Sequence, residues 1–64
     1  MTLQEQMILE IKTRLVDANI TRVASKSGVD RATISTLIDG RTAPRKSTII
    51  ALAVYLGIDI PEGF

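Results

Sequence analysis

Residues 19–40, NITRVASKSGVDRATISTLIDG, decide the fold of this 64-residue chain. Ala24 is followed four positions later by Gly28, and Ile34 and Leu37 then supply apolar side chains at the spacing of a second helix. Two short helices that cross steeply need a small residue at their contact and a glycine where the chain reverses. The stretch therefore predicts a helix-turn-helix, and most units of this kind place a helix in the major groove of DNA.

The boundaries of the two helices follow from their capping residues. Asn19 is a preferred N-cap, so the first helix is expected over about 20–27, and Gly28 ends it in the left-handed conformation. Asp30 is the expected N-cap of a second helix over 31–39. Its carboxylate also complements the partial positive charge at the start of that helix.

The flanking sequence predicts further helices and no sheet. Apolar residues recur at three- and four-residue steps over 3–17, where Thr2 is available as the cap, and again over Ile49–Leu56, where Gly57 stops the helix. Residues 58–64 are too few to decide between one helical turn and an ordered tail. No run alternates polar and apolar residues for long, so we expect an all-α, compact bundle of four to five helices.

The composition limits the class of protein. A chain of 64 residues buries only about 60% of the surface that it exposes when unfolded, so we expect a single domain over residues 1–64, with the helix-turn-helix at about 20–39. Hydrophobic residues make up 45% of the chain, but with one Phe, one Tyr and no Trp the core must be aliphatic. Cys and His are absent, which removes the thiol nucleophile, the imidazole base and the ordinary zinc site. The sequence therefore predicts no catalytic residue, no metal site, no cofactor and no enzyme activity.

The sequence also predicts a cytoplasmic protein. No apolar run approaches the roughly 20 residues that cross a bilayer. Residues 1–12 lack the positive start and the cleavage site of a signal peptide. We expect no membrane partner, and no small-molecule ligand is evident.

Positive charge is concentrated on the helix-turn-helix and the loop that follows it. The net charge of the chain is only +1, but the segment from Arg22 to Lys46 carries six basic and two acidic residues, a net charge of +4. Residues 1–21 sum to −1 and residues 47–64 to −2. A basic segment of this kind attracts nucleic acid, and we expect double-stranded DNA as the partner.

These motifs resemble the Cro/repressor-type helix-turn-helix family of small phage and bacterial regulators. The resemblance rests on VASKSGVDRATISTLIDGRTAP at 23–44 and IIALAVYLGI at 49–58, and it covers nearly the full length. It implies a lambda-repressor-like fold and a sequence-specific transcriptional regulator from a phage or prophage. Lactose-repressor-type modules share the pattern around VASKSGVDRATIS, but they usually begin almost directly with the two-helix unit, whereas a long helix precedes it here.

Three residues depart from the family pattern. Ile20 stands where the family often has a glutamine that grips the phosphate backbone, and Ser27 stands where an apolar residue is common. Arg45 stands where a serine often caps the next helix.

The outward face of the second helix is the predicted reading surface. At 100° per residue, Ile34 and Leu37 define the buried side, while Asp39 faces outward but repels phosphate. Small and hydroxyl side chains suit a major groove about 12 Å wide, and an arginine can bind guanine with two hydrogen bonds. The resemblance implies base contacts at the same early positions. The predicted base contacts are Arg31, Ala32, Thr33, Ser35 and Thr36. A phosphate contact for Arg31 and plain solvent exposure for the hydroxyl residues are the alternatives.

Phosphates flank the major groove, so donors are needed on both sides of the reading helix. Free backbone amides and the helix dipole favour an anion at the start of the first helix. The predicted backbone contacts are Asn19, Thr21, Arg41, Thr42, Arg45 and Lys46. Capping alone is the alternative role of Asn19, and a solvated loop is the alternative for the basic residues.

The C-terminal region is the expected partner surface. Ala51 and Val54 take positions where a solvent-facing helix of the family often carries lysine, and exposed apolar area of this kind marks an interface. We expect a homodimer that uses a surface of Val54, Ile58, Ile60 and Phe64. The alternative is that Ile60 and Phe64 fold back onto the domain's own core.

Two other classes of function are weighed against DNA binding. In the first, the domain is a protein-interaction module, such as a small antitoxin-like protein, whose activity does not depend on Arg31. In the second it is an enzyme, for which the sequence offers no catalytic constellation. Steep weakening with salt would distinguish DNA binding from both.

Overall fold

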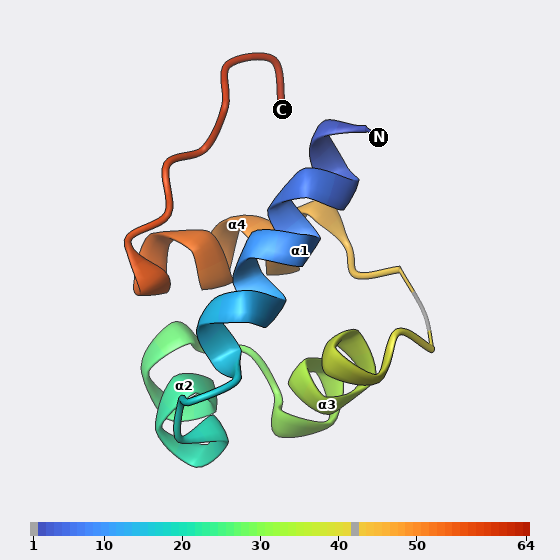
Figure 1. Cartoon of the computed structure of the whole chain (residues 1–64). Helices are drawn as coiled ribbons and strands as arrows, with labels where there is room; N and C mark the ends of the chain where they lie inside the picture. The colour runs from blue at the N-terminus through green and yellow to red at the C-terminus, as the bar shows by residue number, and fades with distance from the viewer. Residues whose placement is uncertain (1, 42) are drawn as a thin grey trace.

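The part of the chain that the structure describes contains four α-helices and no strand. The computed structural model describes residues 2–41 and 43–64, and its helices are α1 (Leu3–Leu15), α2 (Ile20–Ser27), α3 (Arg31–Asp39) and α4 (Lys46–Leu56) (Figure 1). The all-α prediction is confirmed. In Figure 1, α2 and α3 lie at one end of the domain, and the start of α1 and the C-terminus lie at the other. Within the described residues, no helix is both long enough and apolar enough to span a membrane.

The predicted end of the N-terminal helix was wrong. The helix expected over 3–17 is α1, which ends at Leu15. The N–H of Ala18 donates to the carbonyl of Leu15 (3.1 Å) in the turn that follows. The side chain of Val16 is 78% exposed there, so nothing in the core holds another helical turn. For residues 58–64 the sequence left a helical turn and an ordered tail open. They form no helix, and they end in a turn in which the N–H of Phe64 donates to the carbonyl of Pro61 (3.2 Å).

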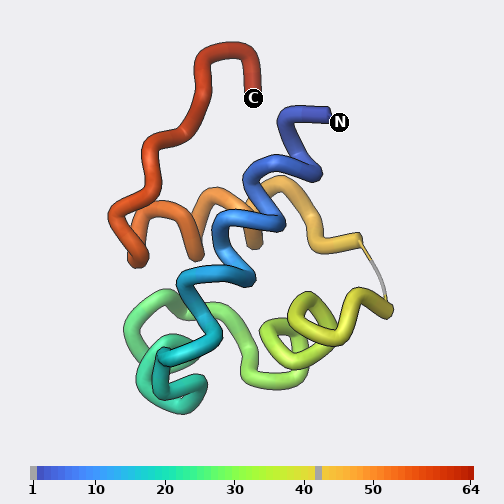
Figure 2. Tube along the Cα trace, in the orientation of Figure 1, coloured from blue at the N-terminus to red at the C-terminus, as the bar shows by residue number. Residues whose placement is uncertain are grey.

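The core is aliphatic and draws on all four helices. In Figure 2 the trace of α1 crosses in front of α4, and contacts join α1 to α3 and α4, and α2 to the same two helices. Full burial of one aliphatic side chain contributes about 1.5–3 kcal/mol, so this cluster is the main source of stability. Its members are Met7, Ile11, Leu15, Val23, Ile34, Leu37, Ile49, Leu52, Ala53 and Ile58.

Ile58 belongs to this core and not to a partner surface. Gly57 ends α4 in the left-handed conformation (φ 73°). A glycine adopts this conformation without steric strain because it has no Cβ atom. The N–H of Ile58 then donates to the carbonyl of Ala53 (2.9 Å), and the reversed chain places the Ile58 side chain inside the domain, 6% exposed. The prediction that Ile58 is available for a dimer contact was therefore wrong.

The C-terminal Phe64 also returns to the domain. Its ring is half-buried against the core, and the Nζ atom of Lys46 lies 5.4 Å from the ring centroid. At an exposed site such a cation–π contact contributes about 0.5–1 kcal/mol. Of the predicted partner surface, Val54 (68% exposed) and Ile60 (40%) remain open to solvent.

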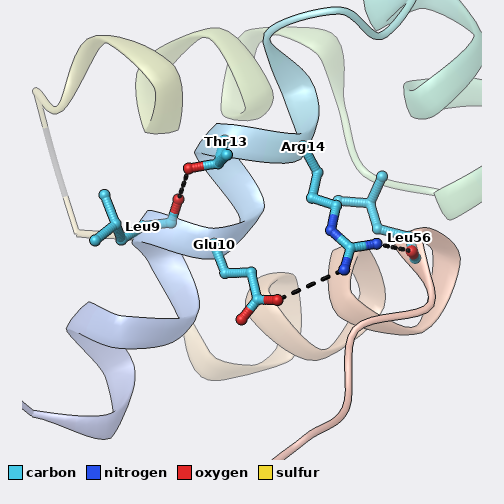
Figure 3. A network of polar contacts seen from close by, with 5 residues as sticks. All are labelled: Leu9, Glu10, Thr13, Arg14 and Leu56. Atoms are coloured by element: carbon cyan, nitrogen blue, oxygen red, sulfur yellow. Dashed lines mark hydrogen bonds and ion pairs between the residues drawn. The ribbon is translucent and has the colours of Figure 1, made fainter.

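A polar contact ties α1 to the end of α4 (Figure 3). The Nη1 atom of Arg14 donates to the carbonyl of Leu56 (3.3 Å), and the Nη2 atom lies 3.6 Å from the Oε1 atom of Glu10. The guanidinium thus satisfies a carbonyl at the negative end of the α4 dipole. Arg14 is therefore engaged within the domain, on a different helix from the predicted reading surface.

Candidate nucleic-acid interface

The turn between α2 and α3 forms as the capping residues predict. The Oδ1 atom of Asn19 accepts from the N–H of Arg22 (3.2 Å) at the start of α2. Gly28 (φ 77°) ends the helix, and the Oδ2 atom of Asp30 accepts from the N–H of Ala32 (3.2 Å) to begin α3. The helix-turn-helix therefore spans residues 20–39, with both helices at their predicted boundaries.

Ser27 has a role in this turn that the sequence did not reveal. Its Oγ atom donates to the carbonyl of Val23 (2.6 Å) and accepts from the N–H of Val29 (3.3 Å). The half-buried hydroxyl thus joins the last turn of α2 to the chain that leaves it. Ser27, at a position where an apolar residue is common in the family, thus links the two sides of the turn by hydrogen bonds.

Helix α3 turns the predicted reading side toward solvent. Ile34 and Leu37 are 0% and 2% exposed and fix α3 against the core. Arg31, Ala32 and Ser35 are exposed, and the predicted contacts Thr33 and Thr36 are half-buried on one flank. The side that could enter a groove is consequently made of short side chains, with Arg31 at the start of the helix.

Thr36 uses its hydroxyl proton within α3. The Oγ1 atom of Thr36 donates to the carbonyl of Ala32 one turn earlier (2.8 Å). The hydroxyl therefore has lone pairs to offer, while its proton is engaged. Thr36 presents an acceptor and a methyl group at this place.

A hollow of about 450 Å³ lies beside this flank, between α3 and the segment that leads into α4. One wall consists of the α3 residues Ala32, Thr33, Thr36 and Leu37, and the other consists of Ala43, Pro44, Arg45 and Thr48. The structure thus brings three predicted base contacts together with the predicted phosphate contact Arg45. Thr48 was missed, because its nearness to α3 depends on the path of the loop and leaves no local signal in the sequence.

The predicted phosphate contacts lie at helix ends. Asn19 and Thr21 are exposed at the start of α2. The side-chain oxygen Oδ1 of Asn19 accepts the capping hydrogen bond, which leaves the side-chain NH₂ group as a donor. The Nη2 atom of Arg41 is 2.9 Å from the Oδ2 atom of Asp39, although the Arg41 side chain is 74% exposed. Arg45 is exposed at the N-cap of α4, and Lys46 is exposed beside Phe64. The predicted contact Thr42 lies outside the described residues.

Comparison with known families agrees with this geometry. A family model described as helix-turn-helix matches residues 11–62, more than three quarters of the chain. This chain belongs to the Cro/repressor-type helix-turn-helix family. Searches of curated proteins and of solved structures returned no match. A domain of this helix-turn-helix family is a DNA-binding regulatory domain.

The departures from the family pattern have structural consequences at the interface. Ile20, at the position where the resemblance suggests a glutamine is often found, is half-buried and packs against the core, so its side chain supplies no donor to a phosphate. Arg45 makes no side-chain cap on α4, which leaves its guanidinium in the solvent. Of the predicted phosphate contacts among the described residues, Asn19, Thr21 and the basic residues after α3 are exposed.

Proposed function

We propose that this protein is a phage or prophage regulator of the Cro/repressor type, which binds double-stranded DNA in a sequence-specific manner and reads the major groove with α3. The observation that carries the proposal is the outward side of α3, where Arg31, Ala32 and Ser35 are exposed while Ile34 and Leu37 anchor the helix in the core. A groove about 12 Å wide admits such a helix. The protein acts as a binding protein and not as an enzyme, in the cytoplasm where its DNA lies.

The charge distribution supports the same proposal. The segment from Arg22 to Lys46, which contains the turn, α3 and the following loop, carries a net charge of +4, whereas the flanking segments are net negative. Exposed cations on both sides of α3 neutralise phosphates and fix the helix in the groove, and base contacts then supply the sequence preference.

Fluorescence anisotropy of a labelled random-sequence duplex pool, titrated at about 50 and 200 mM salt, tests this function. Each phosphate that the protein neutralises adds about −0.9 to the slope of log K against log salt. We expect binding that weakens steeply with salt, and the bound fraction of the pool then yields the operator by repeated selection. An absence of binding even at the lower salt concentration would contradict the proposal.

A pair of charge-matched variants shows where the DNA lies. Arg45→Gln removes one cation from the proposed interface, and we expect the salt slope to become shallower by about 0.9. Lys12→Gln removes one cation from α1, outside the proposed contacts, and should leave the slope unchanged. Equal effects of the two variants would indicate attraction by overall charge and not by this interface.

We further propose that the protein binds DNA as a homodimer through Val54 and Ile60. Both side chains are apolar and exposed (68% and 40%), Val54 near the end of α4 and Ile60 in the tail that follows. A two-fold dimer would set its two α3 helices about one DNA turn apart. Analytical ultracentrifugation over a concentration series should show a dimer for the wild type and a monomer for Val54→Asp. Monomers in both series would count against this dimer in the absence of DNA.

A protein-interaction module is the second candidate, and one observation favours it. An apolar depression of about 220 Å³ lies between α1, the start of α2 and the end of α3, where Val16 (78% exposed) and Ile38 (36%) are open to solvent. A partner protein, such as the toxin of an antitoxin-like pair, would cover these side chains. In that case Val16→Asp abolishes the activity in cells and Arg31→Ala leaves it untouched, which is the reverse of what DNA binding predicts.

A further inference from the structure

Lys46, one of the predicted phosphate contacts, already has a partner within the domain. Its Nζ atom lies 5.4 Å from the centroid of the Phe64 ring, a distance at which the face of an aromatic ring attracts a cation. Both ion pairs within the described residues involve arginine, so no carboxylate holds the ammonium group of Lys46. The aromatic ring is therefore the group that holds this cation in the free protein.

The start of α4 disfavours a cation at this position. Lys46 is the first residue of α4, and the first turn of the helix contains no acidic residue. Arg45 precedes it at the N-cap and makes no side-chain hydrogen bond to the helix. The partial positive charge of a helix N-terminus repels a cation and attracts an anion. The electron-rich face of Phe64 and a phosphate of bound DNA are thus two alternative partners for Lys46.

The ring cannot accompany Lys46 to a phosphate. Phe64 is half-buried and packs against the core, and its N–H donates to the carbonyl of Pro61 (3.2 Å) in the turn that positions it. In Figure 1 the C-terminus lies at the end of the domain opposite α2 and α3. An ammonium group over this ring is therefore drawn away from the proposed DNA surface, and its flexible four-carbon stem must swing to reach a phosphate.

We propose that Phe64 competes with the DNA backbone for Lys46, so that the C-terminal segment makes an autoinhibitory contact with the DNA-binding domain. In the free protein the ammonium group lies over the ring, and in the complex it leaves the ring and binds a phosphate. The inference rests on the proposed function, because it requires DNA beside the start of α4. The coupling is reciprocal: the contact weakens DNA binding, and DNA weakens the contact by the same factor.

Phe64→Leu tests the competition, because leucine keeps an apolar contact with the core and lacks the aromatic face. Loss of an exposed cation–π contact corresponds to about a two- to fivefold change in an equilibrium constant, so Phe64→Leu should bind the labelled duplex pool more tightly by that factor. Phe64→Tyr is the matched control, since it keeps the ring and should bind as the wild type does. Circular dichroism at the temperature of the titration checks that both variants are folded.

A double-mutant cycle assigns the gain to Lys46. In a Lys46→Gln background no ammonium group is left to release, so Phe64→Leu should no longer improve DNA binding. A gain of equal size in both backgrounds, or no gain in the wild-type background, overturns this inference while DNA binding by the same protein stands.

Proton NMR measures the reciprocal effect on the contact itself. The ring current of Phe64 should shift the ε-methylene protons of Lys46 upfield in the free protein, and Phe64→Leu should lack this shift. We expect the shift to disappear when the wild type is saturated with DNA. A shift that persists in the complex shows that Lys46 stays on the ring, which overturns the inference. A wild type that binds no DNA overturns the proposed function and this inference together.

Discussion

Asp39 is the residue whose charge most directly opposes the proposed DNA contact. Its Oδ2 atom lies 2.9 Å from the Nη2 atom of Arg41, so in free protein the carboxylate neutralises a cation that the DNA backbone would use. Both side chains are exposed (74% for Arg41 and 46% for Asp39), and such a pair is worth about 0.2–1 kcal/mol. We expect Asp39→Asn to tighten DNA binding about two- to fivefold and to make the salt dependence steeper, as measured by anisotropy over a salt series.

The pairing itself is tested by a double-mutant cycle. In an Arg41→Gln background, Asp39→Asn removes only the repulsion between the carboxylate and a phosphate. The gain in DNA affinity should therefore be smaller than in the wild-type background. Weaker binding by Asp39→Asn in the wild-type background would contradict the expectation. It would show that the carboxylate accepts a hydrogen bond from a base, such as the amino group of cytosine.

Arg31, the first residue of α3, separates base reading from phosphate binding. If its guanidinium binds guanine, Arg31→Ala should relax discrimination at one base pair by about 1–3 kcal/mol and leave the preference at other positions intact. Dissociation constants for the selected operator and its single-base variants measure this. Arg31→Lys is the control, because it keeps the charge and loses the bidentate geometry. Uniform weakening across all sequences would assign Arg31 to a phosphate.

At the scale of single elements, the contribution of the two Ser27 hydrogen bonds to the stability of the turn can be tested by substitution. Ser27→Ala removes one hydrogen bond to the carbonyl of Val23 and one from the N–H of Val29. Each hydrogen bond contributes about 0.5–1.5 kcal/mol net, so we expect the free energy of unfolding to fall by about 1–3 kcal/mol. Urea denaturation followed by circular dichroism measures the change.

Ser25 supplies the matched control for this substitution. It lies on the same helix, two residues earlier, and is exposed. Ser25→Ala should leave stability unchanged or raise it slightly, because alanine has the higher helix propensity. Equal losses in the two variants would show that the Ser27 hydrogen bonds add nothing to the stability of the turn.

The elements that the sequence predicted well are those fixed by local contacts. The caps at Asn19 and Asp30 join a side chain to a backbone N–H two or three residues away, so residue type and spacing were sufficient for α2 and α3. The end of α1 was misjudged because it depends on where the core ends. Thr48 was missed for a related reason: it comes close to α3 only through the loop that connects the two helices.

At the scale of the whole molecule, the C-terminal segment shows the difference between what hydropathy predicts and what the packing of the helices decides. Hydropathy alone marked Ile58, Ile60 and Phe64 as one apolar surface. The left-handed turn at Gly57 sends Ile58 into the core, and Phe64 packs against the core, so the exposed part of this predicted surface is reduced to Ile60 and Val54. Whether a side chain after a helix points inward depends on the packing of the other helices, which periodicity does not contain.

That reduced surface makes a geometric prediction about the operator. If two copies meet through Val54 and Ile60, their α3 helices should read inverted half-sites about 10 base pairs apart, centre to centre. Insertion of five base pairs turns one half-site to the opposite face of the duplex, so wild-type affinity should fall to that for a single half-site. Val54→Asp should bind the intact operator as weakly as a half-site and should be indifferent to the insertion. A variant that keeps full sensitivity to the insertion would place the dimer contact on another surface.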